Sequence, residues 1–270
     1  MRTFKEIRTS EHLARKEGIT DFEYAVWWLM RISMVVAFAM VFKQYVIDKG
    51  EFSIRIAQIA FNLLLTFVIP FIRILLAWVG DLHKKLTFRC QTWINVTIFL
   101  ASFFGQGLDF YHLYDNWDKV IHFVTGGTVV LIGSEVVTMA MRKGDRVSPL
   151  IRTGTAMGFS CFAIVIWELI EFLFDYFWYE SELQRYGPGA EEDCMNTLFV
   201  KIFGPSANNN VLNEDGDAYL NQWPLFDTNI DMLYAFVSCV IVGTCLFFYL
   251  SKKEKQQATL QTESNESVAV

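Results

Sequence analysis

Six long apolar runs constrain this sequence more than any other feature. Each run is long enough to cross a hydrocarbon core of ~30 Å as an α-helix. Hydrophobic residues make up 53% of the chain, above the ~45–50% of soluble domains, and the excess lies within these runs. The sequence therefore predicts an all-α protein, a polytopic membrane helix bundle of about six transmembrane helices. The predicted spans are about 24–46, 54–79, 91–111, 119–140, 150–178 and 230–250.

Lysine and arginine residues are distributed unevenly between the two sides of this predicted bundle. If the N-terminus is inside, the inner segments contain sixteen of them and the outer segments six. Because cytoplasmic loops are enriched in positive charge, both termini are predicted to be cytoplasmic. Residues 1–23 then form a cytoplasmic N-terminal arm, and 179–229 form an acidic extracytoplasmic loop. The tail 254–270, rich in Gln, Ser, Thr and Glu, is expected to be a disordered cytoplasmic end.

Three carboxylates interrupt the apolar character of the fifth predicted span. Glu168, Glu171 and Asp175 follow one another at i, i+3 and i+7, a spacing that places them on one face of a helix. A carboxylate inside a bilayer is costly unless it faces protein, water or a cation. Three on one face therefore indicate a buried polar site.

Two other segments bring polar residues to the start of a predicted span. Asp118, Lys119 and His122 open the fourth span, and Asp227 and Asp231 lie at the start of the last. In each segment, two of these residues are four positions apart and share a helical face. We therefore expect both segments to face the carboxylates of the fifth span.

Depth estimates place these groups in the same half of the membrane. With a rise of ~1.5 Å per residue, Glu171, His122 and Asp231 lie roughly 9, 10 and 13 Å outside the midplane. Glu168 is deeper, at about 5 Å, and Asp109 lies near the outer end of the third span. The agreement in depth predicts one outward-facing intramembrane pocket.

A pocket formed by these side chains would be strongly anionic. A divalent metal ion held by carboxylates and imidazole would neutralise it and leave open positions for water or substrate. A hydrogen-bonded network of partly protonated acids would also resolve the charge. The candidate catalytic and metal-binding residues are Glu168, Glu171, His122 and Asp231. The candidate substrate-binding residues are Asp118, Lys119, Asp175, Asp227 and Asp109.

Structural roles compete with function for several of these residues. Lys119 lies at the membrane boundary, where its amine can snorkel outward, and Arg31 in the first span can snorkel to the cytoplasmic surface. Asp227 precedes the last predicted span and is a candidate N-cap. The small residues predict close helix contacts at 126–127, 133–134 and 154–158.

Three short segments together resemble a known family. They are Asp-Lys-x-x-His-Phe at 118–123, Trp-Glu-x-x-Glu at 167–171 and Asp-Thr-x-x-Asp-Met at 227–232. In kind and order they are similar to motifs of the YjdF-like family of bacterial inner-membrane proteins and, more distantly, of VanZ-like proteins. The resemblance covers roughly 90–250 and departs from the family pattern at the long segment between the second and third motifs and at Ser238, where glycine is common.

The resemblance implies a location more than a reaction. It places the chain in the bacterial cytoplasmic membrane as a multi-pass protein. YjdF-like proteins imply no particular activity, whereas VanZ-like members are associated with reduced susceptibility to glycopeptide antibiotics of the teicoplanin type. The site is therefore expected to belong to the cell envelope.

The sequence leaves three functional classes open. In the first, the pocket binds or acts on an envelope amphiphile, with metal-assisted hydrolysis or transfer as the chemistry of an enzyme. In the second, the acids and His122 form the relay of a proton-coupled transporter or carrier. The third is a non-catalytic membrane scaffold that affects the envelope or antibiotic tolerance. The net charge of −6 gives no support for nucleic-acid binding.

Overall fold

Every regular element of the described chain is a helix. The computed structural model describes residues 18–48, 53–77, 87–114, 116–141, 146–177 and 223–268. The predicted arm 1–23 is described only from residue 18, and the predicted loop 179–229 lies outside the described residues up to 222. The elements are α2 (Asp21–Asp48), α3 (Ser53–Leu65), α4 (Val68–Ala77), α5 (Arg89–Phe99), η2 (Leu100–Gly107), α6 (Phe110–Leu113), α7 (Trp117–Ala140), α8 (Pro149–Phe177) and α11 (Trp223–Val268).

Length and composition show that this is a membrane helix bundle. Four of the described helices, α2, α7, α8 and α11, are long and apolar enough to cross a membrane. The bent pair α3 and α4 brings the number to five if it counts as one span. The remaining predicted span, 91–111, is α5 continuing without a break into the π-helical segment η2. The all-α membrane bundle is confirmed, whereas the count of six stays a prediction.

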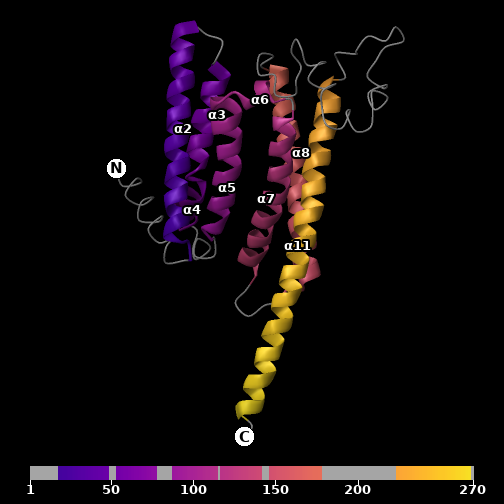
Figure 1. Cartoon of the computed structure of the whole chain (residues 1–270). Helices are drawn as coiled ribbons and strands as arrows, with labels where there is room; N and C mark the ends of the chain where they lie inside the picture. The colour runs from indigo at the N-terminus through magenta and orange to yellow at the C-terminus, as the bar shows by residue number, and fades with distance from the viewer. Residues whose placement is uncertain are drawn as a thin grey trace, which may run out of the picture.

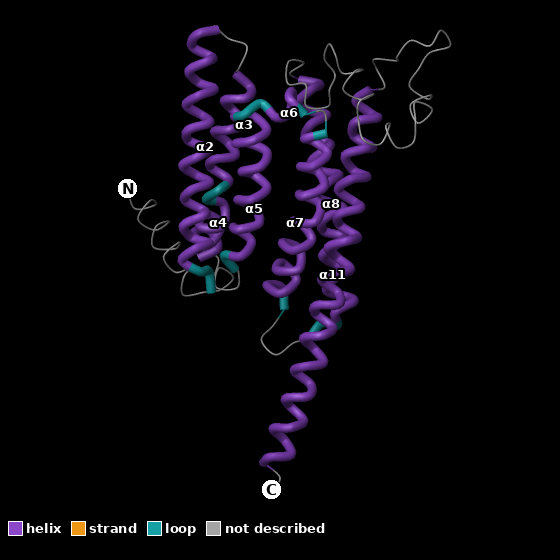
Figure 2. Tube along the Cα trace, in the orientation of Figure 1, coloured by secondary structure: helices purple, strands orange, loops and turns teal. Residues whose placement is uncertain are grey.

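The helices form two groups that lie side by side (Figures 1 and 2). The first group contains α2 to α5, and the second contains α7, α8 and α11, each of which packs against the other two. Contacts of α5 and η2 with α7 join the groups. The beginning of α2 and the end of α11 lie at the same end of the bundle in Figure 1. That end is predicted to be cytoplasmic.

A capping box fixes the beginning of α2. The N–H of Glu23 donates to the hydroxyl of Thr20 at 3.1 Å, and the N–H of Thr20 donates to the Glu23 carboxylate at 2.9 Å. Each side chain thus satisfies a backbone donor that the first helical turn leaves unpaired. The first span accordingly begins close to the predicted residue 24.

The second predicted span, 54–79, is broken rather than continuous. The axes of α3 and α4 differ by 52°. Pro70 lacks the N–H that would donate to the carbonyl of Thr66, and its ring clashes with a carbonyl four residues earlier. Arg31 donates to that carbonyl at 2.5 Å and to the Thr66 hydroxyl at 3.2 Å. The N–H of Ile69 donates to the side chain of Gln91 at 2.9 Å. The break is therefore bridged by side chains of α2 and α5.

The same contacts overturn the prediction that Arg31 snorkels to the surface. Its side chain is buried, and its guanidinium lies 3.9 Å from the ring centroid of Phe67. A cation inside a membrane bundle needs acceptors and polarisable rings nearby. The backbone carbonyl freed at Thr66 and the ring of Phe67 supply them.

The last helix is longer than predicted at both ends. It begins at Trp223 instead of residue 230, and it continues to Val268, so the predicted disordered tail 254–270 is helical as far as it is described. Side chains from residue 252 to residue 262 are exposed. Lys, Glu, Gln and Ala have high helix propensity, and extending an anchored helix avoids the cost of nucleation. These two effects explain a helix that extends beyond the bundle with mostly exposed side chains, one of which, Gln261, accepts a 3.2 Å hydrogen bond from Arg146.

Glycine allows α7 and α11 to approach closely. A Cβ on Gly126 would overlap the backbone of Ala235, and the carbonyl of Gly126 accepts a 2.8 Å hydrogen bond from Ser160 on α8. The predicted close contact at 126–127 is thus confirmed. The one predicted at 154–158 is wrong for its glycines, because Gly154 and Gly158 have open space around them.

Candidate functional site

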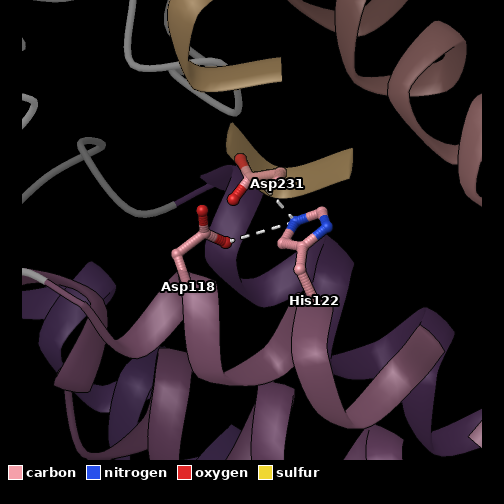
Figure 3. Close-up of side chains that lie close together, drawn as sticks. All are labelled: Asp118, His122 and Asp231. Atoms are coloured by element: carbon pink, nitrogen blue, oxygen red, sulfur yellow. Dashed lines mark ion pairs between the residues drawn. The ribbon is translucent and has the colours of Figure 1, made fainter. Parts of the chain in front are cut away.

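Seven of the predicted site residues meet where α7, α8 and α11 come together. Asp118, Lys119 and His122 come from α7, Glu168 and Glu171 from α8, and Asp227 and Asp231 from α11. All but Asp118 are buried. Figure 3 shows Asp118 and Asp231 on the same side of the His122 ring, from two different helices. These side chains face one another in the described structure, and the outward-facing pocket stays a prediction.

Lys119 is the cation at the centre of an aspartate cluster. Its ammonium lies 2.5 Å from Asp227, 2.7 Å from Asp231 and 3.1 Å from Asp118. Its side chain is only 2% exposed. The prediction that Lys119 snorkels outward is therefore wrong, because three carboxylates at bonding distance compensate for the loss of water.

Asp227 does not cap the last helix. The helix begins four residues earlier, at Trp223, so the side chain of Asp227 points from the first turns of α11 toward Lys119. Asp227 and Asp231 are one turn apart and present two carboxylates to the same ammonium. The i, i+4 pair thus serves as the binding site of a buried lysine.

His122 lies between two groups of carboxylates. Its Nδ1 is 3.5 Å from Glu168, whereas its Nε2 is 3.6 Å from Asp118 and 4.0 Å from Asp231. The dashed lines of Figure 3 mark the two Nε2 contacts. Either ring nitrogen can donate a proton or a lone pair. His122 can therefore connect both groups chemically.

Two overlapping sets of side chains have the spacing of metal ligands. His122, Glu168 and Glu171 offer ligand atoms that all lie within 4.8 Å of one another, and so do Asp118, His122 and Asp231. Two ligands on opposite sides of an ion, each at ~2.0–2.5 Å, are separated by ~4–5 Å. The described side chains thus fit a metal ion on either side of the imidazole.

Charge distinguishes these two sets. The Asp118 and Asp231 carboxylates face Lys119, whereas Glu168 faces the Nδ1 of His122 on the other side of the ring. In all, five carboxylates surround one ammonium and one imidazole. Buried negative charges at this density are unfavourable unless cations or protons compensate them.

Thr228 is a site residue that the sequence interpretation missed. Its side chain lies close enough to interact with the Glu168 carboxylate across the α8 and α11 contact. Thr228 stands inside the Asp-Thr-x-x-Asp segment, next to Asp227. Its position in that motif was the available signal, since a hydroxyl is the simplest group that can orient a neighbouring carboxylate.

Two candidates remain apart from these groups. Asp109 belongs to neither set of possible ligands, and it precedes α6 with a φ of 63°, the only positive φ of a non-glycine among the described residues. Aspartate tolerates this left-handed conformation better than most residues. The side chain of Asp175 lies outside the described part of the structure. Their predicted role in substrate binding stays untested.

Comparisons with known proteins match most of the chain. A family model described as "Predicted membrane protein (DUF2238)" matches residues 25–252. An uncharacterized protein of Thermotoga maritima is 23% identical over 150 residues, which cover 52% of this chain and 76% of that protein. No solved structure matches this chain. The matched family range includes all seven residues of the site.

Proposed function

The chain belongs to the DUF2238 family of predicted membrane proteins, which is the YjdF-like family, and we propose that it holds a divalent metal ion in its buried acid- and histidine-lined site. We propose further that the metal serves to bind or transform an envelope amphiphile in the bacterial cytoplasmic membrane. The likeness to VanZ-like proteins stays a prediction and adds nothing to this proposal.

One observation carries the metal proposal. Glu168, Glu171 and His122 offer three converging ligand atoms that are buried inside a membrane bundle. Lys119 is held by the three aspartates on the other side of the imidazole. A divalent cation would add positive charge to a cluster of five carboxylates. Three protein ligands also leave coordination positions for water or substrate, as in catalytic metal sites.

The donor set favours certain metals over others. Two carboxylates and one imidazole suit zinc, manganese or iron better than calcium, which prefers a shell made of oxygen atoms. Such an ion would supply Lewis-acid activation of a bound water or of a substrate carbonyl or phosphoryl oxygen. Within the protein, Thr228 orients Glu168, and the Nε2 of His122 faces Asp118, which fixes the ring.

The placement of α8 supports an amphiphile as the substrate. Glu168 and Glu171 point into the bundle, while the adjacent Trp167, Leu169 and Phe172 are about half exposed on the outer face of the same helix. Apolar residues on that face contact lipid in a membrane. A lipid that packs against the outside of α8 is therefore separated from Glu168 and Glu171 by about the diameter of one helix. A molecule with an apolar tail could reach the site laterally.

Turnover in defined membranes tests the proposal. The protein is reconstituted in vesicles of phosphatidylethanolamine, phosphatidylglycerol and a polyprenyl phosphate, and zinc, manganese or magnesium is added. Lipid products are followed by mass spectrometry. We expect metal-dependent loss of one lipid that Glu171→Gln abolishes and that Glu254→Gln, a change at an exposed carboxylate of α11, preserves. Equal lipid composition with wild type and Glu171→Gln under every metal would contradict the catalytic proposal.

A proton-coupled carrier is the second candidate function. It rests on the series of titratable groups that runs from the partly exposed Asp118 through His122 to the buried Glu168 and Glu171. Such a series can pass protons between the outer surface and the bundle interior. A pH gradient across the same vesicles should then drive a proton flux that His122→Gln abolishes. If neither lipid turnover nor proton flux is observed, the non-catalytic membrane scaffold remains as the candidate function.

A further inference from the structure

The ammonium of Lys119 lies beside a place that fits a metal ion. It contacts Asp118 and Asp231, which with His122 form one of the two possible ligand sets. Nitrogen-to-oxygen distances of 2.5–3.1 Å are only slightly longer than the ~2.0–2.5 Å of metal–oxygen bonds. Lys119 therefore binds Oδ2 of Asp118 and Oδ1 of Asp231, two carboxylates that a second cation would need, while the other oxygen of each carboxylate faces His122.

A second observation indicates that this place has unused ligand capacity. The Oδ2 atom of Asp231 is buried and accepts no hydrogen bond from the described residues. It faces the Nε2 of His122 at 4.0 Å. The Nε2 atom also lies 3.6 Å from Asp118, so an imidazole nitrogen and two carboxylates converge beside the ammonium. A charged acceptor without a full set of partners is costly in a buried site.

We infer that Lys119 is a tethered cation that replaces a second metal ion as the partner of these carboxylates and thereby sets the number of metal ions in the site at one. The second position consists of Asp118, His122 and Asp231, with Asp227 as an additional acceptor. The inference rests on the proposed function, because the first position is the proposed metal site of Glu168, Glu171 and His122. It adds a role for Lys119 that the metal proposal alone does not require.

Electrostatics explain why the lysine excludes a metal. An ammonium within 3.1 Å of three carboxylates and a divalent ion at the same place would repel each other strongly at low dielectric. A tethered group also competes at a high effective concentration, whereas a free ion is dilute. Removal of the amine should therefore create a vacant cation position lined by three aspartates and an imidazole. Replacement of Lys119 by arginine keeps a tethered cation, so the number of metal ions bound per chain should stay the same.

Metal stoichiometry tests this inference. Wild type, Lys119→Ala and Lys119→Arg are purified in detergent, equilibrated by dialysis against manganese or zinc, and measured by elemental mass spectrometry. We expect about one ion per chain for wild type and Lys119→Arg, and about two for Lys119→Ala. The additional ion should be lost in Lys119→Ala combined with Asp231→Asn, whereas Glu171→Gln should remove the first.

The outcomes separate this inference from the proposed function. One ion in both wild type and Lys119→Ala would overturn the inference and leave the metal proposal intact. No ion in wild type but one in Lys119→Ala would support the inference and overturn the resident metal. No ion in either variant would overturn both.

A second variant keeps the test decisive if Lys119→Ala does not fold. Lys119→Ala combined with Asp227→Asn removes one negative charge along with the positive one and keeps Asp118, His122 and Asp231. This double variant should bind the same number of metal ions per chain as is expected for Lys119→Ala, about two. Metal-dependent thermal stabilisation of this variant above that of wild type would also support the second position, and equal stabilisation would contradict it.

Discussion

The ammonium of Lys119 and the carboxylate of Asp227 lie 2.5 Å apart, although the two residues are 108 positions apart in the chain. Their contact joins the first turn of α7 to the start of α11, and both side chains are 2% exposed. Asp231 and Asp118 complete the same cluster. The pair thus fixes one end of the three-helix group that carries the site, the end that is predicted to face outward.

Breaking this pair should destabilise the protein more than removing both partners. Lys119→Met leaves three carboxylates without their cation, and those of Asp227 and Asp231 are buried; such a change typically costs about 3–5 kcal/mol. Lys119→Met combined with Asp227→Asn removes one of these charges, so the double variant should unfold at a higher temperature than Lys119→Met. Thermal unfolding in detergent measures both.

A lysine outside the bundle gives the matched control. Lys253→Met changes an exposed residue of α11 and should leave the unfolding temperature unchanged. A double variant no more stable than Lys119→Met would show that the pair does not account for the stability of this end.

Gly126 should not tolerate a side chain, whereas Gly158 should. Gly126→Ala would push a methyl group into the backbone of Ala235, and such overpacking costs about 1–3 kcal/mol or more. Gly158→Ala introduces the same methyl group into open space. Unfolding in a denaturant series should separate the two variants. Equal stability would contradict the close contact between α7 and α11.

The break in the second span predicts a suppressor mutation. Arg31→Met removes both donors to Thr66, and an unsatisfied buried carbonyl costs about 1–3 kcal/mol. Pro70→Ala returns an N–H at the position from which a continuous helix would donate to Thr66. The double variant should therefore lose less stability than the sum of the single variants. Additive losses in a double-mutant cycle would argue that Arg31 acts through other contacts.

The orientation of the bundle can be tested at the end of α11. Leu260 is exposed on the part of the helix that projects beyond the bundle, at the end predicted to be cytoplasmic. Leu260→Cys, in a background lacking the five native cysteines, should react with a charged maleimide in inside-out vesicles and not in intact cells. Labelling of intact cells would reverse the orientation and place the site in the inner half of the membrane.

The candidate site was predictable because its signals are local. The spacing of Glu168 and Glu171 and the spacing of Asp118 and His122 each define one helical face. Rise per residue then places those faces at similar depths. The structure brings these residues together on α7 and α8, so short-range geometry was sufficient for the location of the cluster.

The partner of each charge was not predictable in the same way. Lys119 alone at a span boundary is typical of a snorkelling residue, and Asp227 before a predicted span is typical of a cap. Only the contact between α7 and α11 shows that the charges of Lys119 and Asp227 compensate each other. The broken span is a similar case, because Pro70 signals a break, whereas Arg31 and Gln91 bridge it from other helices.

The metal content of the protein as isolated from membranes tests the central claim most directly. Wild type, Asp109→Asn and the double variant His122→Ala, Glu168→Gln are purified without added metal or chelator, and their metals are measured by elemental mass spectrometry. The account predicts about one divalent ion per folded chain in wild type and Asp109→Asn, and none in the double variant. A metal-free wild type that also binds no zinc, manganese or magnesium when these are added would contradict it.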